Sequence, residues 1–298
     1  MLENLTTEQR NTRSTHLDQL SVHDLLQLMN DEDALVIPAI KEQLPQIASA
    51  VTAMIAARKQ GGRLIYTGAG TSGRMGLIDA VECVPTFSTT PEEVMGLIAG
   101  GQQAFVRAVE GAEDDRDLGV ADLKSIQLTD KDVVIGITAS GRTPYVAAGL
   151  TYANELGATT VGISCNAGSL IGQLAQHPIE VVLGPEVLTG STRLKAGTAQ
   201  KIICNMLSTA VMVGSGKVYG NLMVDVQLTN EKLVERGKKI IMEATDCTYE
   251  QAAQALAQAD NKPKVAIVML LTGVTKAQAL EKLTQADGFI RKTLPTTA

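Results

Sequence analysis

Five short runs of β-branched and aliphatic residues recur along the chain, and each is separated from the next by a stretch with helical character. The runs are GRLIYT (62–67), VMGLIA (94–99), DVVIGIT (132–138), TTVGIS (159–164) and IEVVLG (179–184). Continuous apolar runs are typical of strands buried on both faces, and intervening helices make consecutive strands parallel. Right-handed crossovers then predict an α/β fold, a five-stranded, doubly wound parallel sheet with helices on both faces.

The segments on either side of these runs are helical in pattern. Apolar residues at helical spacing predict one long, kinked helix over 31–59 and another over 196–213. From Thr248 the chain reads as three short helices, since Thr248 and Thr275 each begin a Thr-x-x-Gln capping box. The apolar run 265–271 fits a helix or a strand equally well.

The expected organisation therefore has three parts. N-terminal helices occupy 1–60, the sheet domain with its flanking helices occupies 61–245, and a small three-helix domain occupies 246–298. Within the three-helix part, Gly273 and Gly288 are expected to end individual helices.

Composition excludes several classes of function. The 298 residues are 45% hydrophobic and 19% charged, as in globular chains, and the net charge of −6 speaks against nucleic acid or an acidic membrane as a partner. No uncharged run predicts a membrane span, and the first residues lack the apolar core of a signal peptide. The 4 cysteines form no CxxC pair and are expected to be reduced, which favours a cytoplasmic protein. The 3 histidines show no metal-ligand spacing, so no metal site is predicted.

A glycine-rich loop, GAGTSG (68–73), directly follows the first strand and opens a helix. It matches the dinucleotide pattern GxGxxG, but the second strand ends in Gly100 and Gly101, where that pattern requires an acidic residue for the ribose. The loop instead carries the hydroxyls of Thr71 and Ser72 beside the free N–H groups of a helix N-terminus. We therefore predict that Gly70, Thr71 and Ser72 bind a terminal phosphate.

A second hydroxyl loop follows the third strand, where Ser140, Gly141 and Thr143 stand in ASGRTP (139–144). A strand order of 2-1-3-4-5 would make the first and third strands neighbours at the point where the sheet reverses direction, which is where doubly wound sheets bind ligands. The two loops would then converge on one anion. For either loop alone, a Gly/Ser turn that caps a helix is the alternative.

These two loops resemble the phosphosugar-binding loops of the sugar isomerase (SIS) domain, a flavodoxin-like fold. The segments GPEVLTGSTRLKAGTAQK (184–201) and GKVYGNLMVDVQLTNEKL (216–233) are similar to the signature shared by N-acetylmuramic acid 6-phosphate etherases and the glucokinase regulatory protein. The resemblance extends from NTRSTHLD (11–18) to the C-terminal helices. A single SIS domain in a chain of this length resembles the etherase family, since the regulator has two.

The resemblance implies a lyase and a reaction course. The etherase family cleaves the lactyl ether of N-acetylmuramic acid 6-phosphate into N-acetylglucosamine 6-phosphate and D-lactate, by removal of the C2 proton, elimination and addition of water. It implies a homodimer, a small phosphosugar substrate and no cofactor. Glu82 matches the family's proton donor to the leaving oxygen, and Glu113 matches its other catalytic glutamate, to which we assign C2 proton abstraction.

Spacing alone does not select these two glutamates. Glu113 belongs to an acidic cluster that reads equally well as the solvated first turn of a helix, and its other members are Glu110, Asp114, Asp115 and Asp117. Glu82 also fits a solvated helix carboxylate. The choice of both residues rests on the resemblance.

A third anion-binding pattern lies in the loop 190–198, where hydroxyls and cations precede a helix. We predict that Ser191 and Lys195 hold the lactyl carboxylate or the developing enolate; a tight turn with solvated cations is the alternative. Arg74 and Arg142 follow the two hydroxyl loops and either add to the phosphate field or lie on the surface. Two other functions stay open at this point, a phosphosugar isomerase and a non-enzymatic phosphosugar-sensing regulator.

Overall fold

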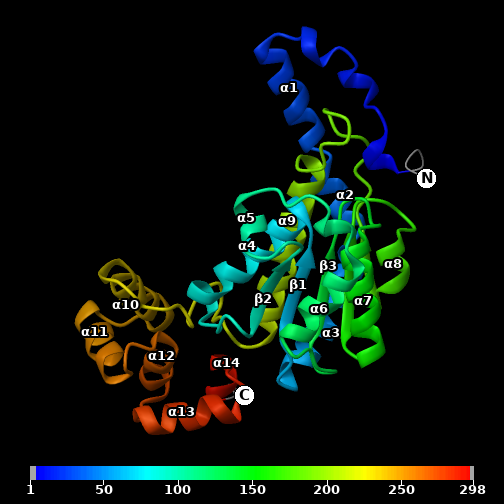
Figure 1. Cartoon of the computed structure of the whole chain (residues 1–298). Coiled ribbons are helices and arrows are strands. Elements are labelled where there is room, and N and C mark those ends of the chain that lie inside the picture. The colour runs from blue at the N-terminus through cyan, green and yellow to red at the C-terminus, as the bar shows by residue number, and fades with distance from the viewer. Residues whose placement is uncertain (1–4, 296–298) are drawn as a thin grey trace. The chain divides into compact units, whose positions relative to one another are not determined.

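The computed structural model describes residues 5–295 and contains one parallel sheet. Its strands are β1 (Leu64–Gly68), β2 (Val94–Ile98), β3 (Val133–Ile137), β4 (Thr159–Ser164) and β5 (His177–Glu180), in the order β2-β1-β3-β4-β5 (Figure 1). The predicted doubly wound fold and its strand order are confirmed. The last strand was predicted over 179–184 but both begins and ends earlier, because its ladder with β4 pairs Val161 with His177 and Ser164 with Glu180.

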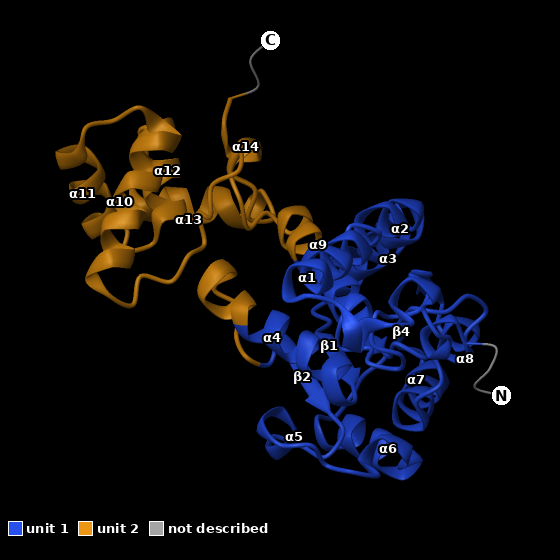
Figure 2. Cartoon of the chain, turned by 90° about the horizontal axis from the view of Figure 1, so that it is seen from above, with its two compact units in different colours: residues 1–81, 92–208 blue, residues 82–91, 209–298 orange. Residues whose placement is uncertain are grey.

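Helices cover both faces of the sheet because successive side chains of a strand point to opposite sides. α4 (Gly70–Phe87) packs on the face that carries Tyr66 and Ile137, where Gly76 lets the helix approach closely. α7 (Pro144–Leu156) packs on the other face, over Gly136. Figure 2 shows α3 (Leu44–Lys59) across the sheet from α7 and from α6 (Arg116–Ser125).

The predicted helix over 31–59 is interrupted. α1 (Val22–Asp33) is followed by α2 (Val36–Glu42), and α3 begins at Leu44 after Gln43 leaves helical geometry. Pro45 occupies the first turn of α3, where the N–H that proline lacks would be unpaired in any case. The remaining helices of this part are α5 (Gln103–Val106) and α8 (Leu170–Leu174), and the first residues form the 3-10 turns Thr6–Glu8, Thr12–Ser14 and Leu17–Gln19.

The chain divides into two compact units, residues 1–81 with 92–208 and residues 82–91 with 209–298 (Figure 2). The first holds the sheet. α9 (Lys195–Gly214), predicted over 196–213, contributes to both. Within residues 5–295, every helix is too short or too polar to cross a lipid bilayer.

The second unit is built of helices around its own apolar core, which includes Ile241, Leu256 and Ile267. Its helices are α10 (Glu231–Thr245), α11 (Tyr249–Gln258), α12 (Pro263–Thr272), α13 (Lys276–Gln285) and α14 (Ile290–Thr293). Both capping boxes form as predicted, and the ambiguous run 265–271 is helical. The structure shows one more short helix than the three expected, because the chain makes a further turn after Gly288. α10 also packs on α11 and α12, so this core begins before residue 246.

Candidate active site

The glycine loop passes directly from β1 into α4. Gly70 has φ +52°, a conformation that favours glycine, and begins the helix. A Cβ at Gly73 would lie 2.6 Å from the carbonyl oxygen of Gly68, so only glycine lets the helix start this close to the strand. Thr71 is half-buried and Ser72 is buried. The predicted phosphate-binding hydroxyls thus stand on the first turn of α4.

The second hydroxyl loop begins beside the first, because Gly68 of β1 and Ile137 of β3 are partners in the ladder. Here Thr138 Oγ1 lies 2.6 Å from Thr143 Oγ1 and 3.3 Å from Ser140 Oγ. Gly141, with φ +74°, turns the chain between them. The predicted neighbourhood of the two loops is confirmed by the pairing of β1 with β3; their binding of phosphate stays a prediction.

Asn166, just beyond β4, holds the second loop and was not predicted from the sequence. Its Nδ2 donates to the carbonyl oxygens of Ala139 and Ser140 and to Thr7 Oγ1, and its Oδ1 accepts from the backbone N–H of Thr6. The N-terminal segment is therefore tied to the loop that carries Ser140. The sequence does carry one signal for its role: Asn166 comes just after a predicted strand, and so lies at the same carboxyl edge of the sheet as the two hydroxyl loops.

Glu113 shares a cavity with the glycine loop. It lies in the 3-10 turn Ala112–Asp114, is exposed, and lines a cavity of about 220 Å³ whose wall also contains Gly70, Arg74 and Glu110. The other acidic members of the cluster do not line this cavity, and Asp115 instead caps α6 by accepting the N–H of Leu118. Among the acidic residues of the cluster, the geometry therefore leaves Glu110 and Glu113 as the candidates for a catalytic carboxylate in this cavity.

Arg74 forms part of the same wall and is bound to protein. Its guanidinium donates to the carbonyl oxygens of Phe105 (3.0 Å) and Ala104 (2.7 Å). It therefore ties the end of α5 to the first turns of α4. Arg142, after the second loop, is exposed.

Glu82 lies on α4, is exposed, and falls in the segment 82–91 of the second unit. The other carboxylate of this helix, Asp79, is buried and accepts hydrogen bonds from Tyr66 Oη (2.8 Å) and Ser208 Oγ (3.1 Å). Burial raises the pKa of the Asp79 carboxyl above its ordinary value, against the effect of these hydrogen bonds. Asp79 therefore has a structural role in the packing of α4, whereas the carboxylate of Glu82 is accessible to solvent or to a ligand.

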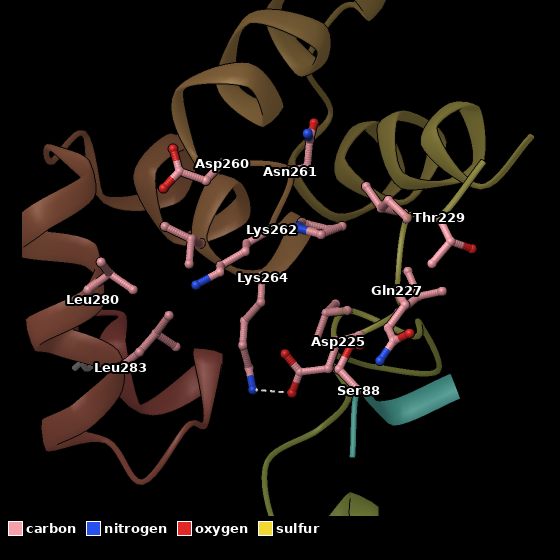
Figure 3. A pocket seen from close by; sticks show the side chains of 15 residues that line it. Ser88, Asp225, Gln227, Thr229, Asp260, Asn261, Lys262, Lys264, Leu280 and Leu283 are labelled. Atoms are coloured by element: carbon pink, nitrogen blue, oxygen red, sulfur yellow. Dashed lines mark hydrogen bonds and ion pairs between the residues drawn. The ribbon is translucent and has the colours of Figure 1, made fainter. Parts of the chain in front are cut away.

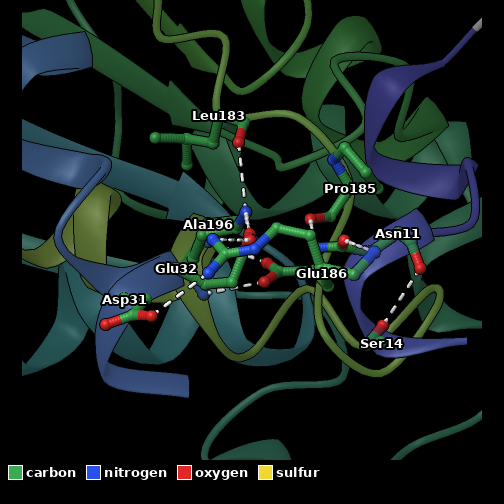
Figure 4. Close-up of polar contacts among 10 residues, drawn as sticks. Asn11, Ser14, Asp31, Glu32, Leu183, Pro185, Glu186 and Ala196 are labelled. Carbon is green, nitrogen blue, oxygen red and sulfur yellow. Dashed lines mark hydrogen bonds and ion pairs between the residues drawn. The ribbon is translucent and has the colours of Figure 1, made fainter. Parts of the chain in front are cut away.

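Lys195 is buried in an ion pair. Its side chain is 2% exposed, and its Nζ lies 2.5 Å from Glu32 Oε2 and 3.2 Å from the carbonyl oxygen of Leu183. Glu32 also pairs with Arg13 at 3.0 Å, and Figure 4 shows this group of contacts. The ammonium predicted to meet a substrate anion is therefore held by α1 in this structure.

The N-terminus of α9 is satisfied by the chain itself (Figure 4). The buried carboxylate of Glu186 accepts the N–H groups of Lys195 and Ala196, each at 3.0 Å. The next two N–H groups, of Gly197 and Thr198, bond to carbonyl oxygens of the preceding turn. A protein carboxylate thus occupies the place where a bound anion would accept these hydrogen bonds. The predicted roles of Ser191, which is half-buried, and Lys195 stay predictions.

Breaking the Glu32–Lys195 pair is expected to cost stability. Burial disfavours the charge of Glu32, but hydrogen bonds from Lys195 and Asn11 and the nearby cations outweigh it and hold its pKa below the ordinary value. Glu32→Gln should lower the free energy of unfolding at pH 7 by about 3 kcal/mol, because it leaves the Lys195 ammonium buried without a counter-charge. Urea unfolding measures this. A lowered pKa stabilises above the unfolded value, so the difference from the parent should shrink as pH falls below about 4.

Asp31→Asn is the matched control for this change. Asp31 pairs with the same Arg13, but its side chain is 43% exposed. Its loss should cost less than about 1 kcal/mol, as for other surface pairs. Equal losses for the two variants would contradict the importance of the buried pair.

The second unit has a cavity of its own, of about 530 Å³ (Figure 3). Lys264 stands at its wall and pairs with Asp225 at 2.6 Å. None of the site residues predicted from the sequence lines it. Its walls are formed by Ser88, residues 224–229 and 260–265, Leu280 and Leu283.

Comparisons with known proteins identify the domain type and the relatives of this chain. A model of the SIS domain matches residues 120–210, and one of the glucokinase regulatory protein N-terminal SIS domain matches residues 46–154. The chain is 61% identical over 291 residues to N-acetylmuramic acid 6-phosphate etherase 2 of Lactiplantibacillus plantarum, with 98% of each chain covered. It is 57% identical over 294 residues to the N-acetylmuramic acid 6-phosphate etherase of an Exiguobacterium species, covering 99% of this chain and 100% of that one.

Among solved structures, a phosphoheptose isomerase from Francisella tularensis is similar over 65% of this chain and 100% of its own, with 15% identity and a TM-score of 0.47.

Proposed function

We propose, from the premise that this chain belongs to the family of N-acetylmuramic acid 6-phosphate etherases, that Glu113 and Glu82 divide the proton transfers of ether cleavage on a sugar held by the two hydroxyl loops. The protein is a carbon–oxygen lyase of cell-wall amino-sugar catabolism. It cleaves N-acetylmuramic acid 6-phosphate into N-acetylglucosamine 6-phosphate and D-lactate.

One observation carries the assignment of the site. The cavity lined by Glu113 is also lined by Gly70 of the glycine loop, and the second hydroxyl loop starts at the neighbouring strand. In our proposal, a sugar whose phosphate lies at the glycine loop therefore also meets the carboxylate of Glu113. This supports the assignment of Gly70, Thr71, Ser72, Ser140, Gly141 and Thr143 to the 6-phosphate.

The chemistry requires a base and an acid. The ether oxygen at C3 is a poor leaving group, but it departs once the C2 proton is removed, with the C1 aldehyde accepting the charge. In our proposal Glu113 removes that proton, and Glu82 protonates the departing lactyl oxygen. Elimination leaves a double bond between C2 and C3, and addition of water across it, with oxygen to C3 and hydrogen to C2, gives N-acetylglucosamine 6-phosphate.

Ser191 and Lys195 are our candidates for the lactyl carboxylate. Lys195 would reach it only by exchanging Glu32 for the substrate, because the two are paired in this structure. Ser191 is half-buried in the same turn, and its hydroxyl can act without that exchange.

We also propose a homodimer in the cytoplasm. Exposed apolar side chains at Val22 and Leu26 of α1 and at Ile37 of α2 support a second copy as partner. Within residues 5–295 the cysteines form no disulfide bond, which supports a reducing compartment. The mass of the protein in solution, measured by light scattering, and cell fractionation test these two points.

Release of D-lactate tests the proposed function directly. The purified protein, given N-acetylmuramic acid 6-phosphate, should release D-lactate and N-acetylglucosamine 6-phosphate in equal amounts, and a chelator such as EDTA should not slow it, because the proposed steps use only side chains of this chain. Rapid interconversion of N-acetylglucosamine 6-phosphate or fructose 6-phosphate with an isomer, without lactate release, would instead favour an isomerase. Binding of the phosphosugar without any turnover would favour a regulator.

A further inference from the structure

The segment 184–201 contains a buried glutamine that the proposed chemistry does not use. Gln200 lies on α9, is 0% exposed, and its Oε1 accepts the hydroxyl proton of Ser72 at 3.0 Å. One turn earlier, a Cβ at Gly197 would come within 3.2 Å of Thr71 Cγ2. α9 therefore lies directly against the two hydroxyl residues of the glycine loop.

The amide nitrogen of Gln200 is an unpaired donor. Within residues 5–295, Gln200 Nε2 is one of the few buried side-chain atoms without a hydrogen-bond partner. Buried donors are nearly always paired, so an orphan beside a predicted binding loop needs a reason. Its neighbour Ser72 has only one hydroxyl proton, and in this arrangement that proton points to Gln200 and away from any ligand.

A phosphate changes what Ser72 must do. The oxygens of a sugar phosphate are strong acceptors, so Ser72 binds one with its hydroxyl only by turning its proton from Gln200 to the phosphate. That would leave Gln200 Oε1 facing the lone pairs of Ser72. A half-turn of the amide about its last side-chain bond exchanges Oε1 and Nε2, so that the orphan donor then serves Ser72.

We propose that Gln200 is a positioning residue for the phosphate group. In the ligand-free protein, Gln200 Oε1 accepts the hydroxyl proton of Ser72. When phosphate is bound, the amide of Gln200 rotates by a half-turn, so that Nε2 donates to Ser72 Oγ and Ser72 donates to the phosphate. This proposal rests on the proposed function, which places the 6-phosphate at Ser72. In this proposal, the segment 184–201 contacts the glycine loop through Gln200 and orients the hydroxyl of Ser72.

Calorimetric binding of N-acetylglucosamine 6-phosphate to three variants of the full chain tests the proposal. Gln200→Met removes both hydrogen-bonding atoms at similar size and should weaken binding about tenfold, the effect expected when one buried hydrogen bond that orients Ser72 is lost. Ser72→Ala should weaken it at least as much. The double variant should bind like Ser72→Ala alone, because Gln200 acts through Ser72. The exposed Gln258→Met is the matched control and should bind like the parent.

The outcomes separate this proposal from the function on which it rests. Unchanged binding by Ser72→Ala would overturn the placement of the phosphate. Weakened binding by Ser72→Ala with unchanged binding by Gln200→Met, or independent losses that multiply in the double variant, would overturn the role of Gln200 alone. Should Gln200→Met not fold, Gln200→Glu keeps the acceptor for Ser72 and has no donor when ionised. It should bind weakly at pH 8 and recover relative to the parent at pH 6, and parent-like binding at both pH values would overturn the proposal.

Discussion

Glu113→Gln is expected to lower the rate of D-lactate release about a thousandfold, within the range that a positioned general base contributes. The amide fills the same space but cannot take the C2 proton. The same variant should also fail to exchange the C2 proton of N-acetylglucosamine 6-phosphate with deuterium from solvent, which NMR follows directly. Loss of both readouts is the result expected of the base.

Glu110→Gln is the matched control, since Glu110 lines the same cavity and is also exposed. It should retain lactate release within a few-fold of the parent. If Glu110→Gln were inactive and Glu113→Gln active, the base would be the other carboxylate of the cavity, and the family-based choice between them would be wrong.

Glu82→Gln is expected to lower lactate release by about a hundredfold or more, because the alkoxide would then depart without a proton. The C2 proton should still exchange with deuterium, since Glu113 is intact. The two variants therefore differ in one measurement, and that difference assigns acid and base.

The exposed carboxylate of Glu92 provides a control for the removal of a charge, and Glu92→Gln should behave like the parent. Full lactate production by Glu82→Gln would remove Glu82 from the mechanism. Loss of deuterium exchange together with lactate release would show that Glu82 acts before, or together with, the proton abstraction assigned to Glu113.

The sheet was predictable because its strands are short apolar runs separated by helical stretches, and β1 and β3 at its centre are buried along their whole length. The capping boxes at Thr248 and Thr275 were predictable for a similar reason, since each is a purely local hydrogen-bond pattern. The run 265–271 was not, because periodicity does not separate a short buried helix from a strand. Packing of α12 against α10 and α11 decides it.

The candidate site could be read from the sequence only where its signals are local, and its binding roles stay predictions. Thr71 and Ser72 follow from the loop sequence, but Glu113 is one of several carboxylates in a short stretch. The folded chain separates only some of them, since it places Asp115 at a helix cap and leaves both Glu110 and Glu113 at the cavity. The choice of Glu113 between these two rests on the family. Lys195 read as a free cation because its partner, Glu32, stands 163 positions away. No local pattern reports such a pairing.

The buried pair also makes Glu32 and Lys195 a single mutational unit. A change at one position leaves the other charge buried without a partner. A simultaneous change of both to apolar residues of similar volume keeps the space filled and can leave the free energy of unfolding unchanged. Substitutions at these two positions should therefore occur together as this sequence evolves. An engineered change at Glu32 in α1 must therefore be accompanied by a compensating substitution at Lys195 in α9.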